Sequence, residues 1–189
     1  MVPLPATACL SGGPNVSDSA NPPGSAFVMG GTGGLGRAIC TALAGQGRRV
    51  FFTYRSDPAA AEALAAQLGE GAAGFAWADA TDPDSIAAAA AAARDRVGPP
   101  QAAVFAAGVH IAQPFVHQIT PHEWERVITV ELLGLTRFVA ALLPALRETR
   151  GCFVCLTSIA TISYPPGDAL SAVPKAGMEM LTRPGRSAR

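Results

Sequence analysis

The segment AFVMGGTGGLGRAI, residues 26–39, combines a short apolar run, a cluster of glycines and the start of an amphipathic pattern. The apolar run predicts a buried strand at 26–30, and the pattern after it predicts a helix over 35–47. A glycine-rich turn between a strand and a helix lets the backbone approach a pyrophosphate, and the helix N-terminus offers free N–H groups. This segment therefore predicts a nucleotide-binding α/β fold.

Strand-like and helix-like segments alternate along the rest of the chain. Five such β–α units predict a doubly wound, Rossmann-type parallel sheet in the order 3-2-1-4-5, with helices on both faces. The further strands are expected at 49–54, 74–80, 101–108 and 151–158, and the further helices at 57–69, 82–98, 120–146 and from 170 onward.

Length and composition favour one globular domain. The 189 residues are 49% hydrophobic and 15% charged, with 14 Lys+Arg against 14 Asp+Glu. A net charge of zero argues against nucleic acid or an anionic membrane as a partner. We place the domain at 25–183, after a Pro-, Gly- and Ser-rich extension at 1–24 that is expected to be disordered and before a short tail at 184–189.

The location is predicted to be cytoplasmic, and no metal site is expected. No apolar run reaches the roughly 18 residues of a membrane span, and the N-terminus does not resemble a secretory signal. The cysteines, at positions 9, 40, 152 and 155, offer no second pair of Cys or His for zinc. We interpret them as buried apolar thiols in a reducing compartment.

The end of the second predicted strand indicates which dinucleotide is bound. NAD sites place an acidic residue there for the ribose hydroxyl. This chain has Tyr54 and Arg55, with no Asp or Glu from 37 to 56. A guanidinium suits a 2′-phosphate, so NADPH is favoured over NADH. The alternative is that Arg55 is an ordinary solvated surface residue.

Taken together, residues 25–183 resemble the short-chain dehydrogenase/reductase family, and in particular its 3-oxoacyl-[acyl-carrier-protein] reductase-like members. The family pattern T-G-x-x-x-G-x-G corresponds to residues 29–36, with Met29 in place of threonine. FAAG at 105–108 corresponds to N-N-A-G without its asparagines. The resemblance implies cofactor contacts from Gly30, Thr32, Gly33, Gly34, Leu35, Gly36, Tyr54, Arg55, Asp79 (against adenine), Ala107, Gly108 and Lys175.

The same resemblance implies an active site of Asn, Ser, Tyr and Lys. Ser158 and Lys175 correspond to the serine and the lysine. Ser171 stands where tyrosine is expected, and Glu131 stands where asparagine is expected. Tyrosine donates the proton in the family's carbonyl reduction because a nearby lysine lowers its pKa, and serine is a far weaker acid.

Two features near Lys175 affect this expectation. Pro174 disfavours helical geometry just before it, so the last helix is expected to start near Pro174 and to separate Ser171 from Lys175. Glu131 would either pair with Lys175 or, if desolvation keeps it protonated, act as a substitute acid. Tyr164 is interpreted as a loop residue, and His110, His117 and His122 as surface residues without a catalytic partner.

The family continues beyond this point with further strands, and a chain ending here would leave the fifth strand as an uncovered sheet edge. A partner covering that edge, as a homo- or hetero-oligomer with a related subunit, or a truncated or frameshifted gene would account for this. The sequence thus predicts an NADPH-dependent reductase of a ketone or 3-oxoacyl thioester. The alternative is a non-catalytic nucleotide-binding subunit that pairs with an intact relative.

Overall fold

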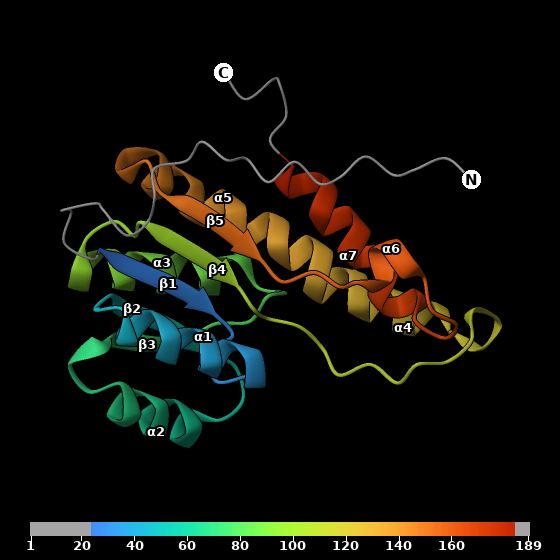
Figure 1. Cartoon of the computed structure of the whole chain (residues 1–189), viewed down its shortest axis with the longest axis horizontal. Helices are drawn as coiled ribbons and strands as arrows, with labels where there is room; N and C mark the ends of the chain where they lie inside the picture. Colours follow the sequence, from blue (N-terminus) through green and yellow to red (C-terminus); the bar gives the residue numbers. More distant parts are fainter. Residues whose placement is uncertain (1–23, 184–189) are drawn as a thin grey trace.

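The structure is a computed structural model that describes residues 24–183 (Figure 1). The predicted extension, except for Gly24, and the predicted tail at 184–189 lie outside these residues. The sheet has five parallel strands in the order β3-β2-β1-β4-β5, which confirms the predicted topology. The strands are β1 (Ser25–Met29), β2 (Arg49–Tyr54), β3 (Ala72–Trp77), β4 (Ala102–Phe105) and β5 (Cys152–Cys155).

Helices cover both faces of this sheet (Figure 1). Their starts follow local capping chemistry: Asp57 and Asp82 each accept backbone N–H groups of the first turn, and Thr120 forms a capping box with Glu123. The helices are α1 (Gly34–Gly45), α2 (Pro58–Leu68), α3 (Pro83–Val97), α4 (Pro121–Ile128), α5 (Gly134–Thr149), α6 (Ala160–Ser163) and α7 (Ala169–Thr182), with short 3₁₀ turns at Gly69–Gly71 and Val116–Gln118.

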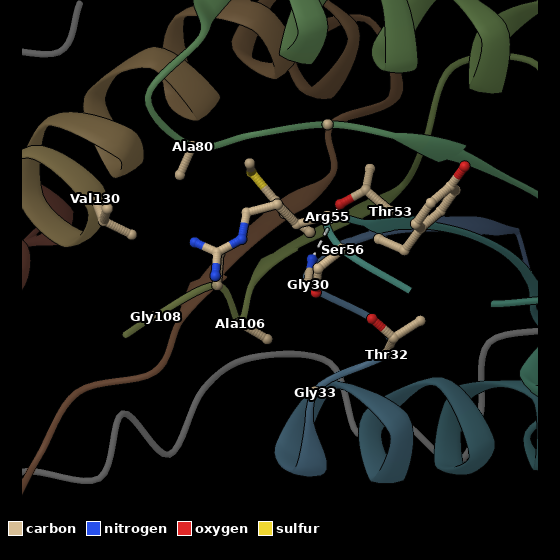
Figure 2. A pocket seen from close by; sticks show the side chains of 14 residues that line it. Gly30, Thr32, Gly33, Thr53, Arg55, Ser56, Ala80, Ala106, Gly108 and Val130 are labelled. Atoms are coloured by element: carbon tan, nitrogen blue, oxygen red, sulfur yellow. Dashed lines mark hydrogen bonds between the residues drawn. The ribbon is translucent and has the colours of Figure 1, made fainter. Parts of the chain in front are cut away.

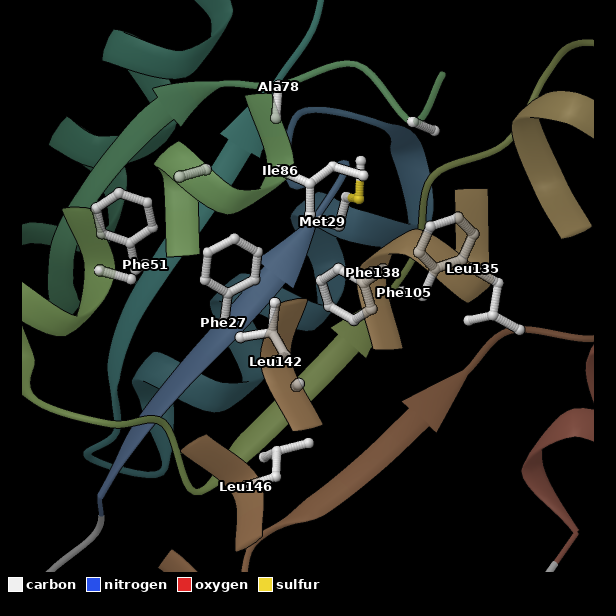
Figure 3. Close-up of a cluster of buried hydrophobic side chains, with 14 of the residues drawn as sticks. Phe27, Met29, Phe51, Ala78, Ile86, Phe105, Leu135, Phe138, Leu142 and Leu146 are labelled. Atoms are coloured by element: carbon white, nitrogen blue, oxygen red, sulfur yellow. The ribbon is translucent and has the colours of Figure 1, made fainter. Parts of the chain in front are cut away.

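Two apolar layers form because successive strand residues point to opposite faces. Along β1, Phe27 and Met29 enter the layer under α3, α5 and α7, whereas Val28 enters the layer under α1 and α2. The first layer contains an aromatic cluster in which Phe138 of α5 packs against Phe27 and Phe105 (Figure 3). Because the strands bury residues on both faces, the sheet has the pattern expected of a parallel sheet packed between two layers of helices.

The predicted continuous helix over 120–146 is wrong in one respect. A π turn at Thr129–Leu133 separates α4 from α5. Arg137 donates from Nη1 to the carbonyl oxygens of Thr129 and Ala80, at 3.2 and 3.1 Å, and so supports the turn. The helical segment Pro121–Thr149 is long enough for a membrane span and contains an 18-residue stretch with a mean hydropathy of 1.7. Within this segment Leu135, Phe138 and Leu142 are buried against the sheet, so part of its apolar character belongs to the core.

The expected helix start near Pro174 is also wrong. α7 begins at Ala169 and contains Pro174 within it. A proline there removes one backbone hydrogen bond, to the carbonyl of Leu170. Leu170, Pro174 and Met178, spaced four residues apart, are buried along the inner face of α7. Burial of this face offsets the loss, so tertiary packing decides the helix boundary.

The cysteine interpretation holds only in part. Cys40 is buried, and burial raises the pKa of its thiol to about 12. Cys152 is exposed and Cys155 is half-buried, because β5 is an edge strand covered on one face only. Cys9 lies outside the described residues. The prediction of buried thiols is therefore wrong for Cys152.

Candidate active site

The glycine-rich turn is held rigidly at the carboxyl end of β1. Gly30 donates its N–H to Oγ1 of the buried Thr53 at 3.0 Å, and Gly31 donates to the Thr53 carbonyl at 2.9 Å. Gly30 has φ +80°, and a Cβ there would lie 2.9 Å from Cα of Ala107. A Cβ on Gly36 would collide with the Gly30 carbonyl oxygen. Glycine is therefore required at positions 30 and 36 by the fold of the turn itself.

A cavity of about 180 Å³ lies between this turn and the ends of β2, β3 and β4 (Figure 2). The Arg55 side chain extends into it between Ala80 and Gly108. The cavity lies at the point where the strand order reverses, which is where doubly wound folds bind ligands. It is lined by Met29, Gly30, Thr32, Gly33, Thr53, Tyr54, Arg55, Ser56, Ala78, Ala80, Ala106, Ala107, Gly108 and Val130.

Asp79 follows β3 beside this cavity without lining it. Its Oδ1 accepts from the Thr81 N–H and from the Thr81 hydroxyl, both at 2.7 Å. Partial burial raises the pKa of the Asp79 carboxyl, but the Thr81 hydrogen bonds and the charge of Arg55 outweigh this effect and hold the pKa below its usual range. Asp79 is thus an ionised group that already has partners.

The residues around the first cavity fit a dinucleotide phosphate. The first turn of α1 contains no acidic residue, and its N-cap, Gly33, provides no side-chain cap. Gly33, Gly34 and Leu35 are exposed, and a Cβ on Gly34 would meet nothing within 4 Å. The helix N-terminus therefore presents free N–H groups and a positive dipole end to open space, with Arg55 as a nearby cation.

A second cavity, of about 280 Å³, lies on the other side of the segment after β4. Ala106, Ala107 and Gly108 line both cavities, so the two are neighbours along one wall. The second cavity brings together residues from the glycine turn, the loop after β4, the π turn, the end of β5 and α7. They are Leu35, Ala106, Ala107, Gly108, Val109, Ile111, Gln113, Glu131, Leu156, Thr157, Asp168, Ser171 and Lys175.

An ion pair lies at the centre of this second group. Glu131 Oε2 is 2.9 Å from Lys175 Nζ, and the side chains are 3% and 15% exposed. At this distance the two groups are in direct contact as opposite charges. A Cβ on Gly108 would lie 3.4 Å from Glu131 Oε1. The expected pairing is confirmed, and it is the π turn that carries Glu131 to this position.

The remaining predicted catalytic residues divide into two groups. Ser171 lines the second cavity together with Lys175, because α7 starts before both of them. Ser158 does not line it; its hydroxyl accepts from the Ala160 N–H at 3.2 Å at the start of α6. The neighbouring Thr157 lines the cavity in its place.

Several residues of the site escaped sequence reasoning. Thr53 supports the glycine turn, and Gln113, Thr157 and Asp168 line the second cavity. Asp168 precedes Ser171 by three residues, which is helical spacing, and this signal was lost because the helix was expected to begin at Pro174. Gln113 lies in a loop, where no periodicity marks it.

The residues interpreted as unrelated to catalysis lie outside both cavities. Tyr164 is 62% exposed and ends α6 with φ +45°, as a loop residue would. His110, His117 and His122 are exposed. Within residues 24–183, no group of three or more His, Cys, Asp or Glu side chains could hold a metal ion.

Comparison with known proteins identifies the family. A family model described as enoyl-(acyl carrier protein) reductase matches residues 30–184. The chain belongs to the short-chain dehydrogenase/reductase family. A solved short-chain dehydrogenase/reductase from Saccharomyces cerevisiae superposes with a TM-score of 0.77 at 22% identity, over 84% of this chain and 62% of that one. The resemblance predicted from residues 25–183 and the fold are thereby confirmed.

Three curated relatives of this chain are named for their activities. An acetoacetyl-CoA reductase from Synechocystis is 31% identical over 84% of this chain, and a 3-oxoacyl-[acyl-carrier-protein] reductase from Staphylococcus aureus is 29% identical over 84%. A serine 3-dehydrogenase from Agrobacterium fabrum is 32% identical over 75%. The matches cover 64%, 65% and 56% of these relatives, respectively, so the chain spans less than two thirds of their length.

Proposed function

We propose that this chain is an NADP(H)-dependent oxidoreductase that interconverts a ketone or 3-oxoacyl thioester and the corresponding alcohol. The observation that carries the proposal is the exposed glycine turn at the N-terminus of α1, with Arg55 extending into the cavity beside it. The acetoacetyl-CoA and 3-oxoacyl reductases among its relatives support the substrate class.

In this proposal the free N–H groups of α1 hold the pyrophosphate and Arg55 holds the ribose 2′-phosphate. Asp79 accepts from the adenine, and Ala107 and Gly108 provide close backbone contact. The nicotinamide, when bound, supplies the hydride. The chain's own task is to orient the carbonyl and to provide the proton, and the second cavity contains Ser171, Thr157 and Lys175 for this purpose.

Proton transfer is the step that this chain supports weakly. Ser171 is a poor acid compared with tyrosine, and Lys175 is already paired with Glu131. A positioned general acid contributes about 10²–10⁴-fold to a rate, so turnover should be slower by a factor of that order than in a relative with tyrosine.

The buried ion pair also favours a second function, a non-catalytic nucleotide-binding subunit that associates with an intact relative. Lys175 tied to a carboxylate at 2.9 Å is less available to a ribose or substrate hydroxyl. In that case the first cavity would bind the nucleotide while the second cavity would carry no reaction.

Cofactor binding is tested by titrating the protein with NADPH and NADH and following the nicotinamide fluorescence. We expect NADPH to bind more tightly than NADH. Arg55→Ala should weaken NADPH binding by about 10–100-fold, as for loss of a hydrogen bond to a charged group, and should change the affinity for NADH little. Arg147→Ala, an exposed arginine at the end of α5, serves as the control. If neither NADPH nor NADH binds, both proposed functions are contradicted.

Turnover separates the two functions. NADPH oxidation is measured with acetoacetyl-CoA and simple ketones for the parent chain, Ser171→Tyr and Glu131→Gln. Activity that rises in Ser171→Tyr supports the oxidoreductase with a weakened acid. Activity in the parent that disappears in Glu131→Gln, while that variant stays folded by circular dichroism and still binds NADPH, would identify Glu131 as a substitute acid. Nucleotide binding with no turnover in the parent or in Ser171→Tyr supports the non-catalytic subunit.

A further inference from the structure

The Asp168 side chain has an unusual orientation for a helix N-cap residue. It precedes α7, where an aspartate side chain ordinarily accepts a backbone N–H of the first turn, as Asp57 and Asp82 do in this protein. The Asp168 side chain makes no such bond. It lines the second cavity instead, where Oδ1 accepts from Gln113 Nε2 at 3.4 Å. Asp168 is therefore turned away from its ordinary structural role and toward the cavity.

The charges around the second cavity leave this carboxylate unbalanced. Three titratable side chains line the cavity among the described residues: Glu131, Lys175 and Asp168. Glu131 and Lys175 form an ion pair with each other, so their charges cancel within the cavity. No salt bridge joins Asp168 to a cation within residues 24–183, and its hydrogen bond from Gln113 is long. The cavity thus carries a net negative charge.

We infer that Asp168 binds the ammonium group of a small amine-bearing substrate, with Gln113 assisting beside it. This inference rests on the proposed function and narrows its substrate to an amino ketone or amino alcohol, in place of a 3-oxoacyl thioester. An ammonium group provides three donors for a carboxylate that has room for more partners. A free carboxylic acid would be repelled by the same charge, and a neutral acyl chain would leave Asp168 desolvated without a partner.

The spacing along α7 defines what the substrate resembles. Asp168 and Ser171 lie one helical turn apart, and neighbours at this spacing are roughly 5–6 Å apart between Cβ atoms. A ligand that reaches both would carry its ammonium group one or two carbons from the reacting hydroxyl or carbonyl. Small vicinal amino alcohols and amino ketones have this form.

The test uses three ligands that share the unit CH₃–CH(OH)–CH₂ and differ in the charge of the group attached to it. They are 1-amino-2-propanol, which is cationic, 2-butanol, which is neutral, and 3-hydroxybutyrate, which is anionic. Each is titrated by calorimetry into protein saturated with NADP⁺. We expect the amine to bind at least about tenfold more tightly than 2-butanol, as for a hydrogen bond between charged groups, and the anion to bind most weakly.

Asp168→Asn keeps the shape and removes the charge, and we expect it to abolish the preference for the amine. Asp95→Asn, an exposed aspartate on α3, should retain it. Because the Asp168 side chain caps no backbone group, Asp168→Asn should lower the unfolding temperature only slightly, through its charge at the N-terminus of α7, and thermal unfolding of the variant checks for a folding defect. Asp168→Ala provides a second loss of charge.

The outcomes distinguish this inference from the proposed function. An amine preference that depends on Asp168, with no reduction of NADP⁺ by the amino alcohol and no oxidation of NADPH by any of the ketones or by acetoacetyl-CoA, supports the inference while contradicting oxidoreduction. If NADP⁺ does not bind, the same three ligands are titrated into the free protein, and the amine preference measured there tests the inference. Equal affinity for the amine and 2-butanol, a preference that survives Asp168→Asn, or binding by none of the three ligands would overturn the inference.

Discussion

Glu131 and Lys175 show how two buried charges depend on each other. Separately, each would be an uncompensated charge with little access to solvent, since the Glu131 side chain is 3% exposed and the Lys175 side chain 15%. Removing one member of such a pair typically costs about 3–5 kcal/mol, whereas replacing both by apolar residues is often neutral. The stability of this region therefore depends on keeping both charges or neither.

We predict that Glu131→Gln lowers the free energy of unfolding by about 3 kcal/mol or more, because Lys175 remains buried without a counter-charge. The double variant Glu131→Leu/Lys175→Met should recover most of that loss. Urea unfolding followed by circular dichroism measures both. A double variant less stable than Glu131→Gln would show that the pair itself, and not burial of a lone charge, dominates.

The glycines of the turn give a second prediction, in which one substitution changes the stability of the fold and another changes nucleotide binding. Gly36→Ala should destabilise the fold, since a Cβ there collides with the Gly30 carbonyl. Gly34→Ala should leave stability unchanged or improved, because open space surrounds Gly34. It should weaken NADPH binding, because the added methyl group obstructs the N-terminus of α1. Gly45→Ala, also open but at the far end of α1, is the control for propensity alone. Thermal unfolding and nucleotide titration, read side by side, make the comparison.

At the level of single residues, the sequence predicted well where a motif and a packing rule agreed. The glycine turn followed from its place between a strand and a helix. The pairing of Glu131 with Lys175 followed from the family resemblance, which implies one active site for both, and from the position of Glu131 on the apolar face of the long helix. Asp168 was missed because Pro174 suggested a later helix start. A local rule about proline was overridden by burial of the inner face of α7.

Among the helices, α4 provides a prediction about pH. Hydrogen bonds from the Thr120 N–H and hydroxyl to Glu123 Oε2, both 2.8 Å, hold the pKa of Glu123 below its usual value. A carboxyl with a depressed folded-state pKa stabilises the fold above its ordinary pKa, about 4.3, and loses that contribution as the pH falls through the folded value.

We therefore expect Glu123→Gln to be less stable than the parent at neutral pH and to show a smaller difference from it below about pH 4. Urea unfolding at a series of pH values is the measurement. Glu125→Gln, an exposed acid two residues later with no capping role, should follow the parent throughout. Parallel curves for Glu123→Gln and the parent would exclude the linkage.

Helix positions were predictable from caps and apolar periodicity, but the π turn was not. The sequence of 120–146 satisfies helical spacing throughout, so nothing in it indicates a wider turn. The Arg137 bonds to the Thr129 and Ala80 carbonyls depend on a residue far away in the chain. Such contacts exist only in the folded molecule, and no local pattern encodes them.

For the molecule as a whole, strict β–α alternation was enough to predict the strand order, because right-handed crossovers leave few alternatives. The same order exposes β5. Within residues 24–183 no strand pairs with its outer edge, and Val154 is 44% exposed there. Open strand edges promote association, and a charged side chain on the edge opposes it.

Val154→Lys should accordingly reduce self-association of the chain at a given concentration, measured by sedimentation. Val116→Lys places the same charge on an exposed valine in a 3₁₀ turn, away from any strand, and should have no such effect. Identical sedimentation of the parent and Val154→Lys would mean that the edge of β5 takes no part in association.

Two cavities that share the wall from Ala106 to Gly108 suit a ligand made of two tethered halves. Once one half of the ligand is bound, the other half is held near its own cavity at a high effective concentration. The affinity of the whole ligand therefore exceeds that of either half alone. A fragment such as adenosine 2′,5′-bisphosphate should then bind on its own, with modest affinity and with no sensitivity to changes at Glu131. Divided binding of this kind would let the nucleotide remain bound in variants whose second cavity is altered.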